Sequence, residues 1–140
     1  MNARRTYEVL ILDRNKAFCA KLEKIFGRMI AHMVDARVRV NCAGDVASLR
    51  KLKKKDIYMA CIDMDAAKKW GPELASFFSA KKDCVTALLF SRKDVLSFRK
   101  YSRNTEGRLP FDATVLKDDQ SLELLLELAR IFLQPILKKT

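Results

Sequence analysis

Short apolar runs alternate with segments of helical periodicity along the whole chain. Five runs of β-branched, aromatic and other apolar residues predict strands at Tyr7–Leu12, Val38–Cys42, Ile57–Ile62, Cys84–Phe90 and Ala113–Leu116. Apolar residues recur at helical spacing in five further segments: Lys16 to about Val34, Asp45 to about Lys54, a segment from about Pro72, Val95–Tyr101 and Ser121–Leu133. Asn104–Pro110 is expected to be a loop. Strict alternation of strands and helices predicts a parallel sheet with helices on both faces.

The first strand carries no phosphate-binding glycine motif. Neither G-x-G-x-x-G nor G-x-x-x-x-G-K-[ST] follows it, which argues against a dinucleotide-binding fold or a nucleotide triphosphatase. A flavin- or nucleotide-binding protein would also need a hydroxyl- and glycine-rich loop at this place, so it is disfavoured. The remaining fold is α/β, a doubly wound (βα)5 flavodoxin-like sheet of five parallel strands, in a single domain over residues 1–140.

Composition and the length of the apolar segments indicate the class of protein and its location in the cell. Nearly half of the residues are apolar and about a third are charged, which is typical of a globular protein. Val9–Leu12 and Leu122–Leu133 are too short or too interrupted to span a bilayer, and Met1–Thr6 does not begin a secretory signal. We therefore expect a cytoplasmic protein without a membrane anchor.

The net charge of +11 favours acidic partners in general. The basic residues are spread along the chain, and no zinc-finger, RNA-recognition or helix-turn-helix pattern accompanies them. We therefore interpret the basic residues as part of ordinary solvent-exposed surfaces, and direct binding of nucleic acid is not expected.

The four cysteines are far apart and form no C-x-x-C pair, so they do not predict a zinc site. Cys42 and Cys61 lie within predicted strands, and we expect them to be buried free thiols.

Polar residues with complementary chemistry follow four of the predicted strands. Asp13 follows the first, Asp63 the third, Ser91 the fourth and Lys117 the fifth. Because parallel strands end at one edge of a sheet, these side chains should converge. A phosphorylated carboxylate needs such a set: a nucleophilic aspartate, acidic groups for a divalent cation, and a hydroxyl and a lysine for the phosphoryl oxygens. The alternative for Asp63 is that it only caps the segment after the strand.

The segments V-L-I-L-D-R-N, C-I-D-M-D-A-A-K-K-W-G-P-E-L, L-L-F-S-R and T-V-L-K-D together resemble the receiver domain of bacterial two-component response regulators, over nearly the whole chain. This resemblance implies a CheY-like signalling phosphoprotein in a two-component system, and leaves open whether it has any enzymatic activity of its own. Asp63 would accept a phosphoryl group from a histidine kinase or phosphotransfer protein. Ser91 would move toward that group and Lys117 would pair with it. Mg²⁺ would be held by Asp13, Asp63 and the main-chain carbonyl of Asp65, which lies in the loop after the acceptor strand.

Several positions depart from the pattern of the family. Arg14 replaces the second acidic residue of the first strand, and an arginine repels a cation instead of binding it. Thr114 stands where the family has an aromatic switch residue, and Asp118 replaces the proline after the lysine. Binding of Mg²⁺ is therefore expected to be weak or absent, and Arg14 could instead lie across Asp63 as a counter-ion. Two hypotheses stay open: a phospho-acceptor with weakened dependence on Mg²⁺, and a phosphorylation-independent pseudo-receiver that acts as a protein–protein interaction module.

The last predicted helix is apolar over more of its surface than one sheet face requires. Leu122, Leu125, Leu126, Ala129, Phe132 and Leu133 form one arc at ~100° per residue, and Leu124, Leu128 and Ile131 widen it. The surplus either packs on the neighbouring helix or binds a second copy or an effector.

Overall fold

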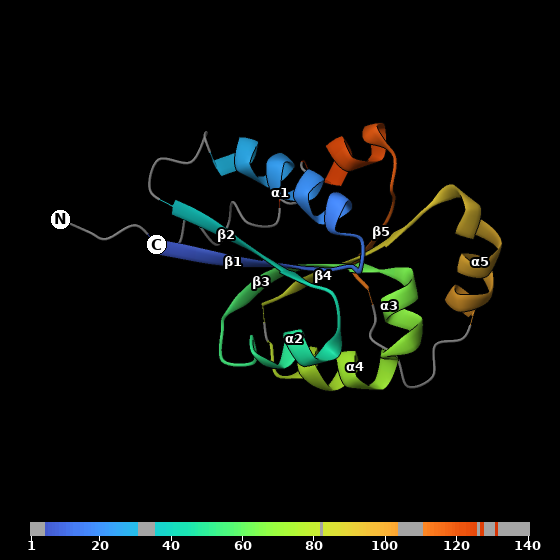
Figure 1. Ribbon diagram of the computed structural model, residues 1–140, viewed down its shortest axis with the longest axis horizontal. Helices are drawn as coiled ribbons and strands as arrows, with labels where there is room; N and C mark the ends of the chain where they lie inside the picture. The colour runs from blue at the N-terminus through green and yellow to red at the C-terminus, as the bar shows by residue number, and fades with distance from the viewer. Residues whose placement is uncertain are drawn as a thin grey trace.

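Five parallel strands form one sheet in the computed structural model, which describes residues 5–30, 36–81, 83–103, 111–125, 127 and 131. The strands are β1 (Arg5–Leu12), β2 (Ala36–Ala43), β3 (Ile57–Asp63), β4 (Val85–Phe90) and β5 (Ala113–Leu116). Their order in the sheet is β2-β1-β3-β4-β5, and every pair of neighbours is parallel (Figure 1). The predicted doubly wound, flavodoxin-like architecture is confirmed.

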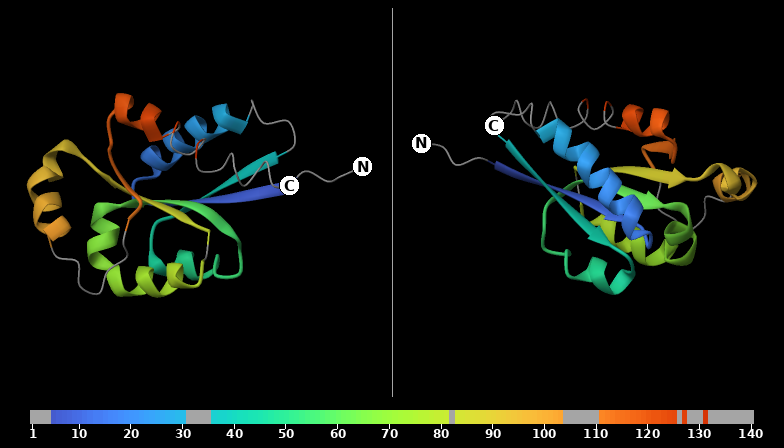
Figure 2. Two further views of the ribbon diagram at one scale, coloured as in Figure 1. Left: turned by 180° about the vertical axis from the view of Figure 1, so that it is seen from behind. Right: turned by 45° about the horizontal axis from the view of Figure 1, so that its top comes forward.

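Helices cover both faces of this sheet (Figures 1 and 2). One face carries α1 (Lys16–Ile30) and a C-terminal helix described over residues 119–125. The other carries α2 (Val46–Arg50), α3 (Met64–Lys69) and α4 (Gly71–Ser79), with α5 (Val95–Arg103) beyond β4 after one 3-10 turn, η1 (Arg92–Asp94). The expected extension of the first helix to Val34, the Asn104–Pro110 loop and most of the last helix beyond residue 125 lie outside the described residues.

Alternation along the strands divides the core into two layers. In β1, Val9 and Ile11 pack in the layer under α1, whereas Leu10 and Leu12 pack in the layer under α2, α3 and α4. Because successive side chains of a strand point to opposite faces, a strand buried on both faces must be apolar throughout. This requirement explains the uninterrupted apolar runs of β1, β3 and β4.

The structure corrects the sequence prediction in three places. The helix expected to reach about Lys54 ends at Arg50, and turns follow it. The loop expected directly after Asp63 is instead the short helix α3. Cys42, expected to be buried, is exposed, because β2 is an edge strand with a neighbour on one side only, whereas Cys61 in the inner strand β3 is buried as predicted.

The described part of the last helix packs against α1. Its N-cap is Asp118, whose carboxylate accepts a hydrogen bond from the Ser121 amide at 2.8 Å. Leu122 and Leu125 are buried in the layer under α1, while Leu124 remains 58% exposed. Among the described helices, none is long and apolar enough to cross a membrane.

Candidate functional site

Three of the predicted site residues meet at the carboxyl edge of the sheet. The Lys117 ammonium lies 2.7 Å from Asp13 Oδ2 and 2.6 Å from Asp63 Oδ1. The three side chains are between 5% and 15% exposed. One largely buried cation after β5 therefore bridges two carboxylates, Asp13 at the end of β1 and Asp63 at the end of β3, and we call these three residues the charged triad.

Asp13 is positioned by the turn that joins β1 to α1. Its amide donates to the Ala43 carbonyl at 2.9 Å, which continues the pairing of β1 with β2 past the last strand residue. Its Oδ1 accepts the Asn15 amide at 2.9 Å, and the Asn15 side chain in turn accepts the Phe18 amide at 3.1 Å as the N-cap of α1. This pair of side-chain hydrogen bonds holds the Asp13 carboxylate in place above the sheet.

Asp63 ends β3 and is also the N-cap of α3. Its Oδ2 accepts the Asp65 amide at 3.1 Å, while Oδ1 binds Lys117. The same carboxylate therefore caps α3, as one interpretation of the sequence predicted, and contacts Lys117 at the carboxyl edge of the sheet. The positive end of a helix at this position also favours its negative charge.

Lys117 follows β5, and its main chain extends the pairing of β4 with β5. Its amide donates to the Phe90 carbonyl at 2.8 Å, which fixes the backbone next to Ser91. Its ammonium also lies 4.5 Å from the centre of the Phe18 ring in α1. The aromatic face adds a favourable contact to the two ion pairs and keeps water from one side of the charge.

The pKa values of the triad respond to burial and to the sharing of a single cation. Burial raises the pKa of Asp63 above the ordinary carboxyl value; Lys117 opposes this shift, and the charges of Asp13 and Asp65 add to it. Burial alone would lower the pKa of Lys117, but the hydrogen bonds and charges of Asp13 and Asp63 outweigh it and raise that pKa. Lys117 therefore stays an ammonium throughout the physiological range of pH.

The other predicted residues lie at the same edge without joining the triad. Ser91 follows β4, and its hydroxyl donates to Asp94 Oδ2 at 2.5 Å, a bond that closes the first turn of η1. Arg14 is exposed, and the cation that pairs with Asp63 among the described residues is Lys117, not Arg14. The expectation that Arg14 lies across Asp63 is thus wrong. Thr114 is exposed on β5.

The carboxylates of Asp13 and Asp63 are the side chains at this edge that the sequence assigns to Mg²⁺. Each of the four carboxylate oxygens of Asp13 and Asp63 already accepts a hydrogen bond, two from Lys117 and two from main-chain amides. Asp65 lies in the first turn of α3, and its amide donates to Asp63 Oδ2. Within the described residues, no three His, Cys, Asp or Glu side chains are grouped to hold a metal ion.

Sequence reasoning missed three residues that hold this edge together. Asn15 supports Asp13, Phe18 covers Lys117, and Asp94 receives the Ser91 hydroxyl. Asn15 carried a signal, since an asparagine before an amphipathic segment predicts an N-cap. Asp94 carried a weaker one, its spacing of three from Ser91. Nothing in the sequence placed Phe18 beside Lys117, because ninety-nine positions separate them in the chain.

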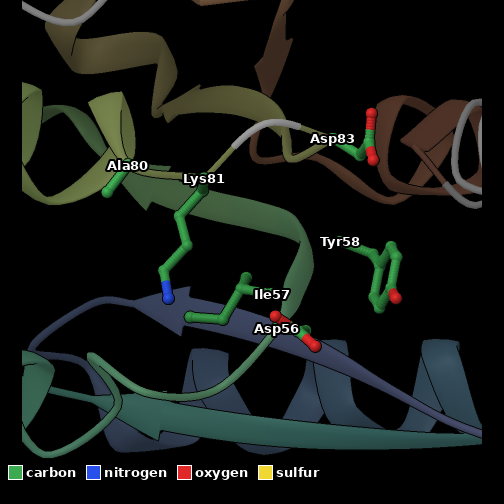
Figure 3. A pocket seen from close by; sticks show the side chains of 6 residues that line it. All are labelled: Asp56, Ile57, Tyr58, Ala80, Lys81 and Asp83. Carbon is green, nitrogen blue, oxygen red and sulfur yellow. The ribbon is translucent and has the colours of Figure 1, made fainter.

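A separate hollow opens at the opposite, amino edge of the sheet (Figure 3). Its volume is about 360 Å³, and its lining residues are Asp56, Ile57, Tyr58, Ala80, Lys81 and Asp83. The Lys81 ammonium is fixed there by the carboxyl-side turn of α2, donating to the carbonyls of Lys53 and Lys55 at 2.6 Å each.

Comparison with known structures identifies the fold. The chain is similar to a response regulator from Thermotoga maritima, with a TM-score of 0.65, 12% sequence identity, and coverage of 92% of this chain and 98% of that one. It is also similar to a fusion that carries the yeast Spc42 trimeric coiled coil (amino acids 181–211), with a TM-score of 0.61, 12% identity, and coverage of 96% and 80%. No protein-family model and no curated protein matches the sequence. The chain has the CheY-like fold of a response-regulator receiver domain.

Proposed function

We propose that this chain is a receiver domain of two-component phosphorelay signalling, in which Asp63 accepts a phosphoryl group from a histidine kinase or phosphotransfer protein with weakened dependence on Mg²⁺. The observation that carries the proposal is the contact of 2.6 Å between the Lys117 ammonium and Asp63 Oδ1 at the carboxyl edge of a receiver fold. A lysine in this position supplies fixed positive charge where phosphoryl oxygens would gather.

In the proposed step, a carboxylate oxygen of Asp63 attacks the phosphorus of a phosphohistidine. The new O–P bond forms as the N–P bond breaks, and the imidazole nitrogen leaves with the electron pair and takes a proton from water. Lys117 neutralises the phosphoryl oxygens. The raised pKa of Asp63, caused by burial, makes its ionised carboxylate a stronger nucleophile.

Ser91 has the second role in this proposal. Ser91 directly follows Phe90, whose carbonyl accepts the Lys117 amide, and its hydroxyl donates to Asp94. After transfer, the hydroxyl would leave Asp94 and donate to a phosphoryl oxygen. This exchange would release the first turn of η1 and alter the surface at α5.

A second candidate function rests on the hydrogen bonds that the triad carboxylates already accept. All four carboxylate oxygens of Asp13 and Asp63 already accept hydrogen bonds, and Arg14 stands in the sequence where the receiver pattern has an acidic residue. These features favour a phosphorylation-independent pseudo-receiver that acts as a protein–protein interaction module.

Intact-mass measurement after incubation with acetyl phosphate, across a titration of Mg²⁺, separates the two candidates. The phospho-acceptor predicts that the wild type gains one phosphoryl group with little dependence on Mg²⁺, that Asp63→Asn gains none, and that the control Asp65→Asn still gains one. Arg14→Asp should restore a strong dependence on Mg²⁺. If neither the wild type nor Arg14→Asp is labelled at any Mg²⁺ concentration, the acceptor function is excluded and the pseudo-receiver stands.

We further propose that the last helix presents a surface to a second copy or an effector. Leu124 is 58% exposed and Ile131 is 57% exposed, although Leu122 and Leu125 of the same helix are buried. Mass in solution for Leu124→Glu and the wild type tests the homodimer. A dimeric wild type and a monomeric Leu124→Glu variant support the homodimer. A monomeric wild type excludes the homodimer, and the effector is then the proposed partner of this surface.

A further inference from the structure

Two cysteines that lie twenty-three positions apart in the sequence come together beside the charged triad. Cys19 lies in the first turn of α1, and Cys42 lies near the end of β2. Figures 1 and 2 show α1 crossing above β1 and β2 at this end of the sheet. Neither cysteine has a part in the proposed phosphoryl transfer.

The register of the sheet places the Cys42 side chain on the face that α1 covers. Cys42 is paired with Ile11 of β1, and Ile11 packs in the layer under α1 together with Cys19. Val40, two residues earlier in β2, packs against the same layer, whereas Ala43 packs in the opposite one. Because side chains alternate along a strand, Cys42 points toward α1.

Hydrogen bonds bring Cys19 to the same place from the other side. Its thiol lies 3.6 Å from the Asp13 carbonyl, and the Asp13 amide is bonded to the carbonyl of Ala43, the neighbour of Cys42. The pKa of each thiol responds to the other, which places the two side chains next to each other. Cys19 is 5% exposed, while Cys42 is exposed because β2 is an edge strand.

The environments of the two thiols differ in a way that assigns them different roles. Burial, together with a smaller contribution from the neighbouring Cys42, raises the pKa of Cys19 to about 12. Burial also raises the pKa of Cys42, but the interaction with Cys19 opposes that shift. Of the pair, Cys42 is the thiol that solvent and a dissolved peroxide reach.

We propose that Cys19 and Cys42 form a reversible oxidation site, in which a hydroperoxide such as hydrogen peroxide converts the dithiol to a disulfide that ties α1 to β2. An accessible thiol beside a second, buried thiol is the arrangement in which oxidation proceeds to a disulfide instead of stopping at a single oxidised sulfur. In a reducing compartment such a disulfide forms transiently and serves as a signal.

The reaction balances with two thiols and one peroxide. The Cys42 thiolate attacks one oxygen of hydrogen peroxide, the O–O bond breaks, and the departing hydroxide takes the proton that the thiol released. This step leaves Cys42 sulfenic acid and one water. The Cys19 sulfur then attacks the Cys42 sulfur, and the sulfenic oxygen leaves with the Cys19 proton as a second water.

The disulfide would act on the turn that carries Asp13. The Cys19 thiol proton, which faces the Asp13 carbonyl, is lost in the reaction, and the first turn of α1 is drawn toward β2 because bonded sulfurs lie only about 2 Å apart. The oxidation site is therefore adjacent to the candidate functional site without sharing a residue with it.

Intact mass and peptide mapping of the full chain test this proposal. After treatment with one equivalent of hydrogen peroxide and alkylation of the remaining thiols, the wild type should lose two hydrogen atoms, bind two alkyl groups instead of four, and yield one linked peptide pair containing Cys19 and Cys42. Dithiothreitol should reverse all three changes. Cys42→Ser should show no loss of two hydrogen atoms. This variant is expected to fold because residue 42 is on the surface.

Two further variants make the result specific. Cys84→Ser, which removes a half-buried thiol in the other layer, should form the same disulfide as the wild type. Cys19→Ser should stop at Cys42 sulfenic acid, trapped by dimedone. The proposal is overturned if the wild type keeps four alkylated thiols, if the linked peptides join other cysteines or two chains, or if Cys42→Ser still loses two hydrogen atoms.

Discussion

Two lysines hold the opposite edges of this sheet, and they do so by different means. At the carboxyl edge, Lys117 bridges the carboxylates of Asp13 and Asp63. At the amino edge, Lys81 bridges the main-chain carbonyls of Lys53 and Lys55 at equally short distances, 2.6 Å each. Each ammonium joins segments that are far apart in the chain.

The partners decide what each bridge can do. Main-chain carbonyls keep the same charge in every condition, so the Lys81 bridge serves to hold the turn after α2. The two carboxylates carry one negative charge more than Lys117 neutralises, and both are nearly buried. A buried group with uncompensated charge is sensitive to protonation and to chemical modification. A short lysine contact alone therefore does not mark a candidate site, and the candidate at the carboxyl edge rests on the sharing of one lysine between two carboxylates.

Of the substitutions at the two edges, removal of Lys117 should have the largest effect on the free energy of unfolding. Lys117→Met leaves two buried carboxylates facing each other without a cation, and we expect it to lower the free energy of unfolding by about 3 kcal/mol. Urea unfolding at neutral pH measures the loss. The double variant Lys117→Met/Asp63→Asn should regain a large part of it, since one of the unpaired charges is gone. Equal losses in the single and double variants would show that packing, not charge, explains the effect.

Removing Lys81 should have a smaller effect. Lys81→Met loses two hydrogen bonds to carbonyls and the contact of its ammonium with the Phe77 ring, 5.3 Å from the ring centre. We expect a loss of about 1–2 kcal/mol in the free energy of unfolding, because water can replace the ammonium at this more open place. The control is Lys53→Met, which keeps the main-chain carbonyl and should change stability by less than about 0.5 kcal/mol. A loss for Lys81→Met as large as that for Lys117→Met would remove the distinction between the two edges.

Neutralising Asp63 should have the smallest effect and should depend on pH. The folded-state pKa of Asp63 is raised by burial, so its contribution to stability is present in full below the unfolded carboxyl value of about 4 and is lost as the pH rises through the folded value. Asp63→Asn removes this loss. At neutral pH the variant should be slightly more stable than the wild type, by less than about 1 kcal/mol.

The measurement for Asp63 is the difference in unfolding free energy between wild type and Asp63→Asn over a series of pH values. The wild type should fall relative to the variant as the pH rises from about 4, and the difference should then level off. A relative gain of the wild type over the same range would mean that pairing with Lys117 outweighs burial at Asp63.

Much of the fold could be predicted from the sequence because its signals are local. The apolar runs of β1, β3 and β4 follow from burial on both faces, and the alternation of strands with amphipathic segments requires a parallel sheet. The convergence of Asp13, Asp63, Ser91 and Lys117 at one edge follows from the same topology. None of these conclusions needed a contact between two particular side chains.

What the tertiary structure alone decided depends on such contacts. Lys117, and not Arg14, is the counter-ion of Asp63, because β5 ends directly beside both carboxylates while the Arg14 side chain is exposed to solvent. The segment after Asp63 became a helix because that carboxylate could cap it.

Cys42 became accessible, and adjacent to Cys19, because the strand order put β2 at the edge under α1. Periodicity reports whether a residue faces inward, and strand order decides whether a neighbour is there to cover it. The sequence by itself determined the architecture and the edge at which the site lies, and the packing of distant segments determined which side chains meet there.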